Sequence, residues 1–268
     1  MKNSILVTIA LCATLAMNAQ DPIWKIGIKL NPNVSWMKPD AKYMTNEGNN
    51  FRFGFSLMVD KQFTDNYAFG TGVNVINTGG KLSYLQKTSE IIPSINEARD
   101  VISKINRSYK LQYVEIPLTL KLRTNEIGYI TYWGQFGLGL GLNIRSKGDD
   151  TIDYLKQATG DVPIEDRWED ATLESVSRED EDIKDDIKMF RTSLIIGGGI
   201  EHNLSGSTSI IAGITYNNGF SNALNNKGVQ TDDRDAAIYE GSGSNKTPKL
   251  YDLKAYTNFI EFNIGLLF

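Results

Sequence analysis

Hydrophobic and polar residues alternate along most of this chain with a period of two. The clearest run, Ile130 to Arg145, places Ile, Tyr, Phe and Leu on one face and Gly, Thr, Gln and Asn on the other. Such a period predicts a β-strand with one apolar face. Eight segments follow it, and most reach the roughly ten residues that a tilted strand needs to cross a bilayer. They cover residues 24–36, 51–63, 67–85, 109–123, 130–145, 190–204, 208–220 and 253–268.

The connections between these segments alternate in length. Long connections cover residues 37–50, 86–108, 146–189 and 221–252, and short ones cover 64–66, 124–128 and 205–206. Outer-membrane barrels alternate in this way because their periplasmic turns are short and their extracellular loops are long. The pattern predicts an all-β fold: an eight-stranded antiparallel up-and-down transmembrane β-barrel with long extracellular loops and no free strand edge.

Alternation alone leaves open which face points outward, because a soluble ligand-binding barrel turns its apolar face inward. Glycine crowds the polar face, which suits a narrow lumen. Aromatic residues cluster at strand ends, as interfacial girdles do; they are Trp24, Trp36, Phe51, Tyr67, Tyr109, Phe190, Tyr216 and Tyr256. The last strand ends on Phe268, which resembles the terminal aromatic signal read by the outer-membrane assembly machinery. We therefore expect an outer-membrane protein that contacts the membrane lipid and that machinery.

The N-terminal segment, residues 1–19, has the features of an export signal: Lys2, a short apolar stretch and a terminal alanine. Residues 20–268 then form the predicted barrel domain. The single cysteine, Cys12, lies in the apolar stretch; a lipid-anchor role is the alternative, although Leu11 before it is larger than such a motif expects. Removal of the signal leaves no cysteine and hence no disulfide framework.

The charge of the chain argues against some classes of function. The net charge of −4, with no basic cluster, argues against nucleic acid as a partner. The connection at 147–187 holds 15 Asp or Glu against 5 Lys or Arg, which predicts a solvated segment. Calcium binding around Asp180 to Asp186 is an alternative, although the run lacks the glycine-turned loop of an EF-hand.

Several segments resemble one family, the PorT-like outer-membrane β-barrel proteins of Gram-negative bacteria. Residues 27–31 (Gly-Ile-Lys-Leu-Asn) are similar to that family's opening strand, and residues 113–121 match its pattern Tyr-x-Glu-Ile-Pro-Leu-x-x-Lys. The Gly-Leu-Gly run at 137–139 and the closing stretch at 262–268 are also similar. The resemblance implies an outer-membrane barrel. Some relatives take part in a protein-secretion apparatus, and most have no known activity.

The polar face carries charged side chains that are predicted to point into the lumen. Eight strands leave room only for side chains, so these charges must pair or meet water. They include Lys25, Lys29, Arg52, Glu115, Lys121, Arg123, Arg145, Arg191, Glu201 and Glu261. We expect a stabilising ion-pair network. The alternative is that Glu115 and Glu261 gate small ions by exchanging basic partners.

Two local irregularities are predicted. The apolar phase shifts from odd to even positions just before Pro117, which favours a β-bulge at 114–116. Ser94 to Glu97 has a capping-box pattern, and Ala98, Ile102 and Ile105 follow at helical spacing, which predicts a short amphipathic helix over the barrel mouth.

No enzyme chemistry is indicated. The only histidine, His202, falls beside a short turn, and no cofactor- or metal-binding set accompanies it. The leading hypothesis is a non-enzymatic outer-membrane barrel whose loops bind a partner or shield the surface. An accessory component of a protein-secretion apparatus, in contact with other envelope proteins, is the second, and a narrow passive channel is the third.

Overall fold

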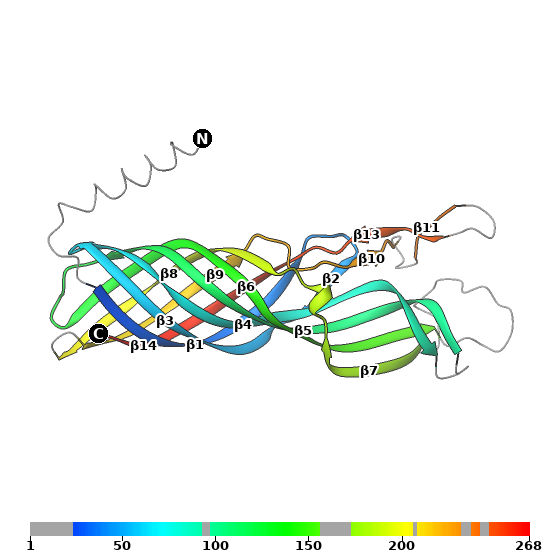
Figure 1. The fold of residues 1–268 in the computed structure, drawn as a ribbon, viewed down its shortest axis with the longest axis horizontal. Coiled ribbons are helices and arrows are strands. Elements are labelled where there is room, and N and C mark those ends of the chain that lie inside the picture. Colours follow the sequence, from blue (N-terminus) through cyan, green and yellow to red (C-terminus); the bar gives the residue numbers. More distant parts are fainter. Residues whose placement is uncertain (1–23, 93–96, 156–172, 206–207, 232–236, 242–246) are drawn as a thin grey trace, which may run out of the picture.

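Eight long antiparallel strands close into a ring (Figure 1). The computed structural model describes residues 24–92, 97–155, 173–205, 208–231, 237–241 and 247–268, so the signal expected at 1–19 lies outside it. The ring strands are β1 (Trp24–Pro39), β3 (Asn50–Thr64), β4 (Tyr67–Ile92), β5 (Glu97–Arg123), β6 (Ile130–Leu155), β8 (Phe190–Ser205), β9 (Thr208–Gly219) and β14 (Ala255–Leu267). Each pairs with its neighbours along the chain, and β1 pairs with β14. The predicted barrel is confirmed.

The outside of the ring is apolar and the inside is polar. Outward-facing Ile28, Phe55 and Ile264 are 57%, 57% and 59% exposed, whereas inward-facing Asn31 and Asn263 are 3% and 1% exposed. Large apolar side chains in open contact with the surroundings suit hydrocarbon, not water. The predicted outward orientation of the apolar face is therefore confirmed. Within the described residues, no helix is long and apolar enough to cross a membrane.

The strands β4, β5 and β6 continue well beyond this apolar belt. Together with β7 (Leu173–Asp182) they form what we call the projecting sheet: residues 81–92, 97–108 and 146–155 and strand β7 (Figure 1). Much of the connections predicted at 86–108 and 146–189 is thus strand. The helix predicted from Ser94 to Ile105 is wrong where the structure describes it, because 97–105 pairs with β4 over its whole length; 94–96 lie outside the described residues.

The bulge predicted at 114–116 is also wrong. Strand β5 keeps one phase throughout, so that Tyr109 and Tyr113 point inward as Glu115 and Lys121 do. What changes along the strand is the interior, which is polar inside the apolar belt and apolar above it. The irregularity lies one pair higher and on the other strand: Gln112 pairs with Arg145 and Tyr113 with Asn143, leaving an extra residue in β6.

A hydrophobic cluster, which we call the capping core, fills the interior above the belt. Its buried members are Met37, Met44, Leu82, Tyr84, Ile105, Tyr109, Leu111, Tyr113, Ile183, Ile187, Ala223, Leu224, Leu253 and Ala255. Short elements surround it: β2 (Met44–Gly48) on β4, the 3₁₀ turn η2 (Lys184–Asp186), and the pair β10 (Lys227–Val229) with β13 (Leu250–Asp252). A second short pair, β11 (Tyr239–Glu240) with β12 (Thr247–Pro248), extends farther out (Figure 1). The projecting sheet therefore has a core of its own.

The opposite rim carries the short connections. Strand β3 leads into β4 through residues 65–66, and β5 leads into β6 through 124–129. Phe268 exchanges two backbone hydrogen bonds with Ile26, of 2.7 and 3.1 Å between N and O, which places the last residue beside the start of β1 at this rim (Figure 1). Because the two ends of the ring differ in this way, we refer below to the short-turn rim and the projecting end.

Candidate functional site

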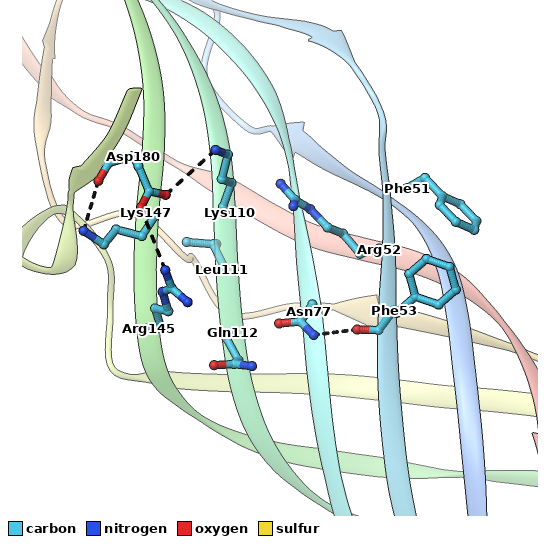
Figure 2. Close-up of a pocket in the computed structure, with 10 residues that line it drawn as sticks. All are labelled: Phe51, Arg52, Phe53, Asn77, Lys110, Leu111, Gln112, Arg145, Lys147 and Asp180. Carbon is cyan, nitrogen blue, oxygen red and sulfur yellow. Dashed lines mark hydrogen bonds and ion pairs between the residues drawn. The ribbon is translucent and has the colours of Figure 1, made fainter. Parts of the chain in front are cut away.

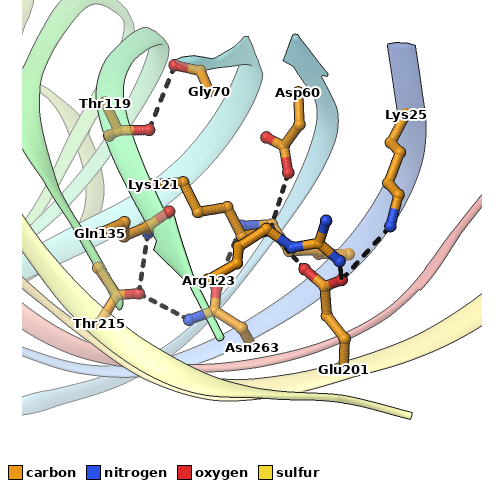
Figure 3. A network of polar contacts seen from close by, with 11 residues as sticks. Lys25, Asp60, Gly70, Thr119, Lys121, Arg123, Gln135, Glu201, Thr215 and Asn263 are labelled. Atoms are coloured by element: carbon orange, nitrogen blue, oxygen red, sulfur yellow. Dashed lines mark hydrogen bonds and ion pairs between the residues drawn. The ribbon is translucent and has the colours of Figure 1, made fainter. Parts of the chain in front are cut away.

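An ion-pair network fills the lumen near the short-turn rim (Figure 3). The Lys121 ammonium lies 2.8 Å from Asp60 and 2.8 Å from Glu201, and its side chain is only 1% exposed. Arg123 also binds Glu201, and the Lys25 ammonium lies 3.8 Å from the same carboxylate. Three cations and two carboxylates thus come from four different strands. Such buried charges tolerate the loss of solvation only while they stay paired.

A second cluster lies higher in the lumen, around Arg191. Its guanidinium donates to the Glu115 carboxylate at 2.7 Å, to the Thr257 hydroxyl at 2.7 Å and to the side-chain amide oxygen of Asn217 at 2.5 Å. The guanidinium carbon lies 5.9 Å from the ring centre of Tyr113 and 5.3 Å from that of Phe259. Arg191 therefore stands where the polar lumen meets the capping core.

Between these clusters, Lys29 and Glu261 line one small cavity with Glu115. Lys29 donates to the side-chain amide oxygen of Asn263 at 3.4 Å, and the Asn31 side-chain amide donates to Glu261 at 3.2 Å. The volume of the cavity is about 30 Å³, close to the space of one water molecule. Amide and hydroxyl groups thus fill the space that the charged groups leave.

Above the belt the lumen is closed by backbone as well as by side chains. Strand β1 lies so close to β4 that a Cβ on Gly80 would stand 2.4 Å from the backbone nitrogen of Met37 and 3.0 Å from the carbonyl carbon of Trp36. Only glycine permits this approach. The capping core lies above this contact, so backbone and buried side chains together occupy the interior at this level.

Within the projecting sheet, Arg107 is the central buried charge. It donates to both carboxylate oxygens of Asp150, at 2.7 and 2.6 Å, and to Asp186 of η2 at 2.5 Å. Burial lowers the pKa of Arg107, but the hydrogen bonds to Asp150, together with charge interactions with Tyr84, Tyr109 and Asp150, hold the pKa above its ordinary value. Beside it the Tyr84 and Tyr109 hydroxyls lie 3.1 Å apart, and burial raises the pKa of both.

A pocket opens on the outer face of the barrel, directly above the apolar belt (Figure 2). Its volume is about 360 Å³. The lining residues are Phe51, Arg52, Phe53, Asn77, Lys110, Leu111, Gln112, Arg145, Lys147 and Asp180. We call it the outer basic pocket because it gathers four cations.

Two of the predicted lumen charges belong to this pocket. Arg145 follows the extra residue in β6, which turns its side chain outward, and it is 61% exposed. Arg52 lies where β3 has left β4: their pairing ends at Phe55 and Val75, and the Arg52 side chain lines the outer pocket. The placement of both residues in the lumen is therefore wrong. The other predicted charges lie inside: Lys25, Lys29, Glu115, Lys121, Arg123, Arg191, Glu201 and Glu261.

The acidic run predicted to bind calcium faces basic groups instead. Asp180 lies 3.9 Å from the Lys110 ammonium and 3.9 Å from the Arg145 guanidinium, and Asp186 binds Arg107. Among the described residues, no three His, Cys, Asp or Glu side chains gather as metal ligands. Part of this acidic segment, 156–172, lies outside the description.

The histidine stands at the short-turn rim, as its place in the sequence predicts. The ring centre of His202 lies 6.4 Å from that of Tyr129, in an edge-on arrangement. Among the described residues, no hydroxyl or carboxyl side chain is bonded to His202 in a way that could form a catalytic set.

Sequence reasoning missed the roles of three residues: Arg107 and Asp150, which it assigned to loops, and Tyr84, which it placed at the end of a strand. A signal was available, since alternation continues through Ile105, Arg107 and Tyr109, but with the apolar residues now on the inside. A switch of this kind marks the level at which a barrel leaves lipid and becomes an ordinary solvated sheet.

The sequence profile of the family described as outer membrane protein beta-barrel domain matches residues 18–225. No curated protein matches the chain.

Several solved outer-membrane proteins are similar to this chain at low sequence identity. The attachment invasion locus protein Ail of Yersinia pestis has 15% identity, with 91% of this chain and 98% of Ail covered, at a TM-score of 0.32. OprG of Pseudomonas aeruginosa has 12% identity, covering 92% and 96%, at 0.36. The outer membrane protease OmpT of Escherichia coli has 8% identity, covering 92% and 96%, at 0.34.

Proposed function

The chain belongs to the outer membrane protein β-barrel domain family, and from this premise we propose that it is a closed, non-enzymatic barrel whose projecting sheet binds a partner at the cell surface. Membership of the family places the chain in the Gram-negative outer membrane. Because long connections of such barrels face outward, the projecting end is the extracellular one. Export by a signal at 1–19 and assembly through Phe268 belong to the same proposal.

The single observation that carries the proposal is the closure of the lumen. Paired charges fill it below, Gly80 brings β1 against β4 above them, and the capping core covers the top. A conducting pore of this family would need a continuous wet path. These features argue against the passive channel and direct attention to the surface outside the membrane.

The projecting sheet has the properties of a binding platform. It is held from within by the capping core and by the pair Arg107–Asp150, while its outer face carries solvated polar groups such as Lys104 and Asn106. A rigid scaffold that presents polar side chains lowers the entropic cost of binding.

Planar-bilayer recording tests the closed lumen. We expect no stepwise conductance from the intact protein, and none from Glu115→Gln or Glu261→Gln. Steady conductance of the parent protein would overturn the proposal that the lumen is closed. Conductance that appears only in the glutamine variants would instead support ion gating by these two carboxylates.

Site-specific photocrosslinking in living cells tests the partner. A crosslinking amino acid at position 104, where Lys104 faces solvent on β5, should yield a discrete protein adduct. The matched control is position 118 on the same strand, where Leu118 is 39% exposed on the lipid side and should yield none. The absence of an adduct at 104, or equal adducts at both positions, would refute the platform.

A second candidate function is an accessory role in a secretion apparatus, as the resemblance of residues 113–121 to PorT-like proteins implies. The same adduct discriminates the two. If the crosslinked protein is a component of an envelope secretion machine and loss of the barrel lowers secretion, this second reading holds. A surface ligand as the adduct supports the first.

A further inference from the structure

The outer basic pocket combines charge and position in a way that the closed lumen and the projecting sheet do not require. Its cations Arg52, Lys110, Arg145 and Lys147 come from β3, β5 and β6. The nearby carboxylates are Asp149, Asp180 and Asp182, which stands opposite Lys147 on β7, so the local sum is 4 − 3 = +1. A net positive recess attracts anions.

Internal pairing leaves part of this charge unused. The Lys110 ammonium is 2.7 Å from Asp149, whose pKa is raised by burial but held below its ordinary value by the hydrogen bond from Lys110. Arg52 also lies near enough to Asp149 to favour its charged form, although it forms no ion pair with it. The contacts of Asp180 with Lys110 and Arg145 are long, at 3.9 Å each. Lys147 donates at 3.0 Å to the backbone oxygen of Asp180, which is not a charged partner.

Among the four cations of the pocket, Arg52 has the fewest partners within the described part of the protein. It forms no ion pair with any residue that the structure describes, and its Nε is buried without a hydrogen-bond partner. Buried donors in native proteins almost always have a partner. A guanidinium in this position is suited to donate hydrogen bonds to a phosphate or carboxylate oxygen of a ligand.

The pocket is continuous with an apolar groove that descends into the lipid-facing belt. A cavity of about 430 Å³ shares Phe53 and Asn77 with the basic pocket and is otherwise lined mainly by apolar side chains, including Leu30, Pro32 and Phe55. A further groove of about 570 Å³ continues from Leu30 and Phe55 along Ile28 and Leu266. The cations thus stand at the upper end of an apolar track.

The track exists because β3 and β4 separate. Above Phe55 and Val75 no ladder joins them. The Asn77 side-chain amide bridges the gap by donating to the Phe53 backbone carbonyl at 2.5 Å (Figure 2). Asn33 of β1 in turn donates to the Asn77 backbone carbonyl at 3.1 Å. The Phe51 and Phe53 rings, 5.0 Å apart, form the step between the polar and apolar parts.

We propose that the outer basic pocket and this groove together bind one phosphorylated lipid of the outer leaflet. The phosphate lies among Arg52, Arg145 and Lys147, and an acyl chain lies along Phe53, Pro32 and Leu30. A water-soluble anion would use only the upper half of the site, whereas a molecule with a phosphate head and an apolar tail uses both. This inference needs the barrel in its membrane but does not depend on a protein partner.

Native mass spectrometry of the full chain in detergent tests it, with diphosphoryl lipid A as the probe. Replacing both Arg52 and Arg145 by Gln should weaken binding about tenfold or more, since each loses a charge-assisted bond. Lys184→Gln, which removes an exposed cation of η2 outside the pocket, should leave affinity unchanged. Lys147→Gln, which disturbs no charged partner, should weaken binding several-fold and provides the test if the double variant does not insert.

Two further probes separate the parts of the ligand. Inorganic phosphate should not compete at concentrations where lipid A is bound, and lipid A without its phosphates should bind much more weakly. Equal binding by the parent and the double variant, or by phosphorylated and dephosphorylated lipid, would overturn the proposal. Competition by inorganic phosphate at matched concentration would show a site for phosphate alone and would equally refute the lipid.

Discussion

Arg107 and Asp150 form a two-point pair across β5 and β6, with N···O distances of 2.7 and 2.6 Å, inside a sheet that stands clear of the apolar belt. The Arg107 guanidinium also reaches Asp186 in η2. One buried side chain thereby ties together the hairpin of β4 and β5, strand β6 and the turn beneath the capping core.

Removal of this guanidinium should loosen the projecting sheet but leave the barrel folded. Arg107→Ala leaves Asp150 buried without its partner, a change that costs about 3–5 kcal/mol for a buried pair. We expect rapid amide hydrogen exchange across 81–108 with unchanged exchange in 113–121. Lys104→Ala, an exposed change on the same strand, should stay within about 0.5 kcal/mol. Equal amide exchange rates of the projecting sheet in the parent and in Arg107→Ala would contradict the role given to this pair.

The lumen cluster around Arg191 should respond to the loss of charge differently from the loss of shape. Glu115→Ala strands the buried guanidinium of Arg191 and should destabilise the barrel by about 3–5 kcal/mol. Glu115→Gln keeps an oxygen for Arg191 and Ser193 to donate to, so its effect should be clearly smaller. Urea titration followed by heat-modifiable gel mobility measures both. Equal effects of the two substitutions would show that the pairing contributes little.

The sequence predicted the barrel well because its signals are local. The strand starts at Trp24, Tyr67, Ile130 and Phe190 agree with the structure, since each opens a run whose alternation reports directly on two faces. The lipid-facing orientation followed from the glycine residues on the polar face and the aromatic residues at the strand ends.

Other parts depended on relations that alternation cannot carry. One extra residue near Arg145 reverses the phase of β6, and the separation of β3 from β4 moves Arg52 outside. Above the belt the inside turns apolar, so Tyr109, expected in an aromatic girdle, is fully buried. These outcomes depend on strand pairing between distant segments, and the outer basic pocket, which they create, could not be predicted from the sequence.

The contact between β1 and β4 should be sensitive to a single methyl group. A Cβ on Gly80 would stand 2.4 Å from the Met37 nitrogen, so Gly80→Ala must push two backbones apart, at about 1–3 kcal/mol. Gly134→Ala is the matched control, because the nearest atom to its Cβ, the Gly197 oxygen, is 3.9 Å away. Thermal midpoints of the inserted proteins compare the two. A loss in both variants, or in neither, would argue against a close approach at Gly80.

The buried tyrosine pair should make stability fall at high pH. The Tyr84 and Tyr109 hydroxyls lie 3.1 Å apart, and burial raises the pKa of both in the folded state. Below about pH 10, the ordinary tyrosine pKa, both groups are protonated in the folded and unfolded states and stability is unaffected. Above it the unfolded chain releases protons that the folded chain retains, so the free energy of unfolding of the projecting sheet declines as pH rises toward the folded pKa values.

Tyr84→Phe removes one of these protons from the balance and should make the decline shallower, by up to about 1.4 kcal/mol per pH unit. The measurement is the free energy of opening of residues 81–108, from amide exchange corrected for the intrinsic pH dependence of exchange, between pH 9 and pH 11, roughly the range that brackets the ordinary tyrosine pKa. Tyr129→Phe, at an exposed site 71% accessible on the short-turn rim, should not alter the slope. An identical slope in the parent and Tyr84→Phe would contradict this prediction. It would mean that the two hydroxyls ionise in the folded sheet as readily as in the unfolded chain.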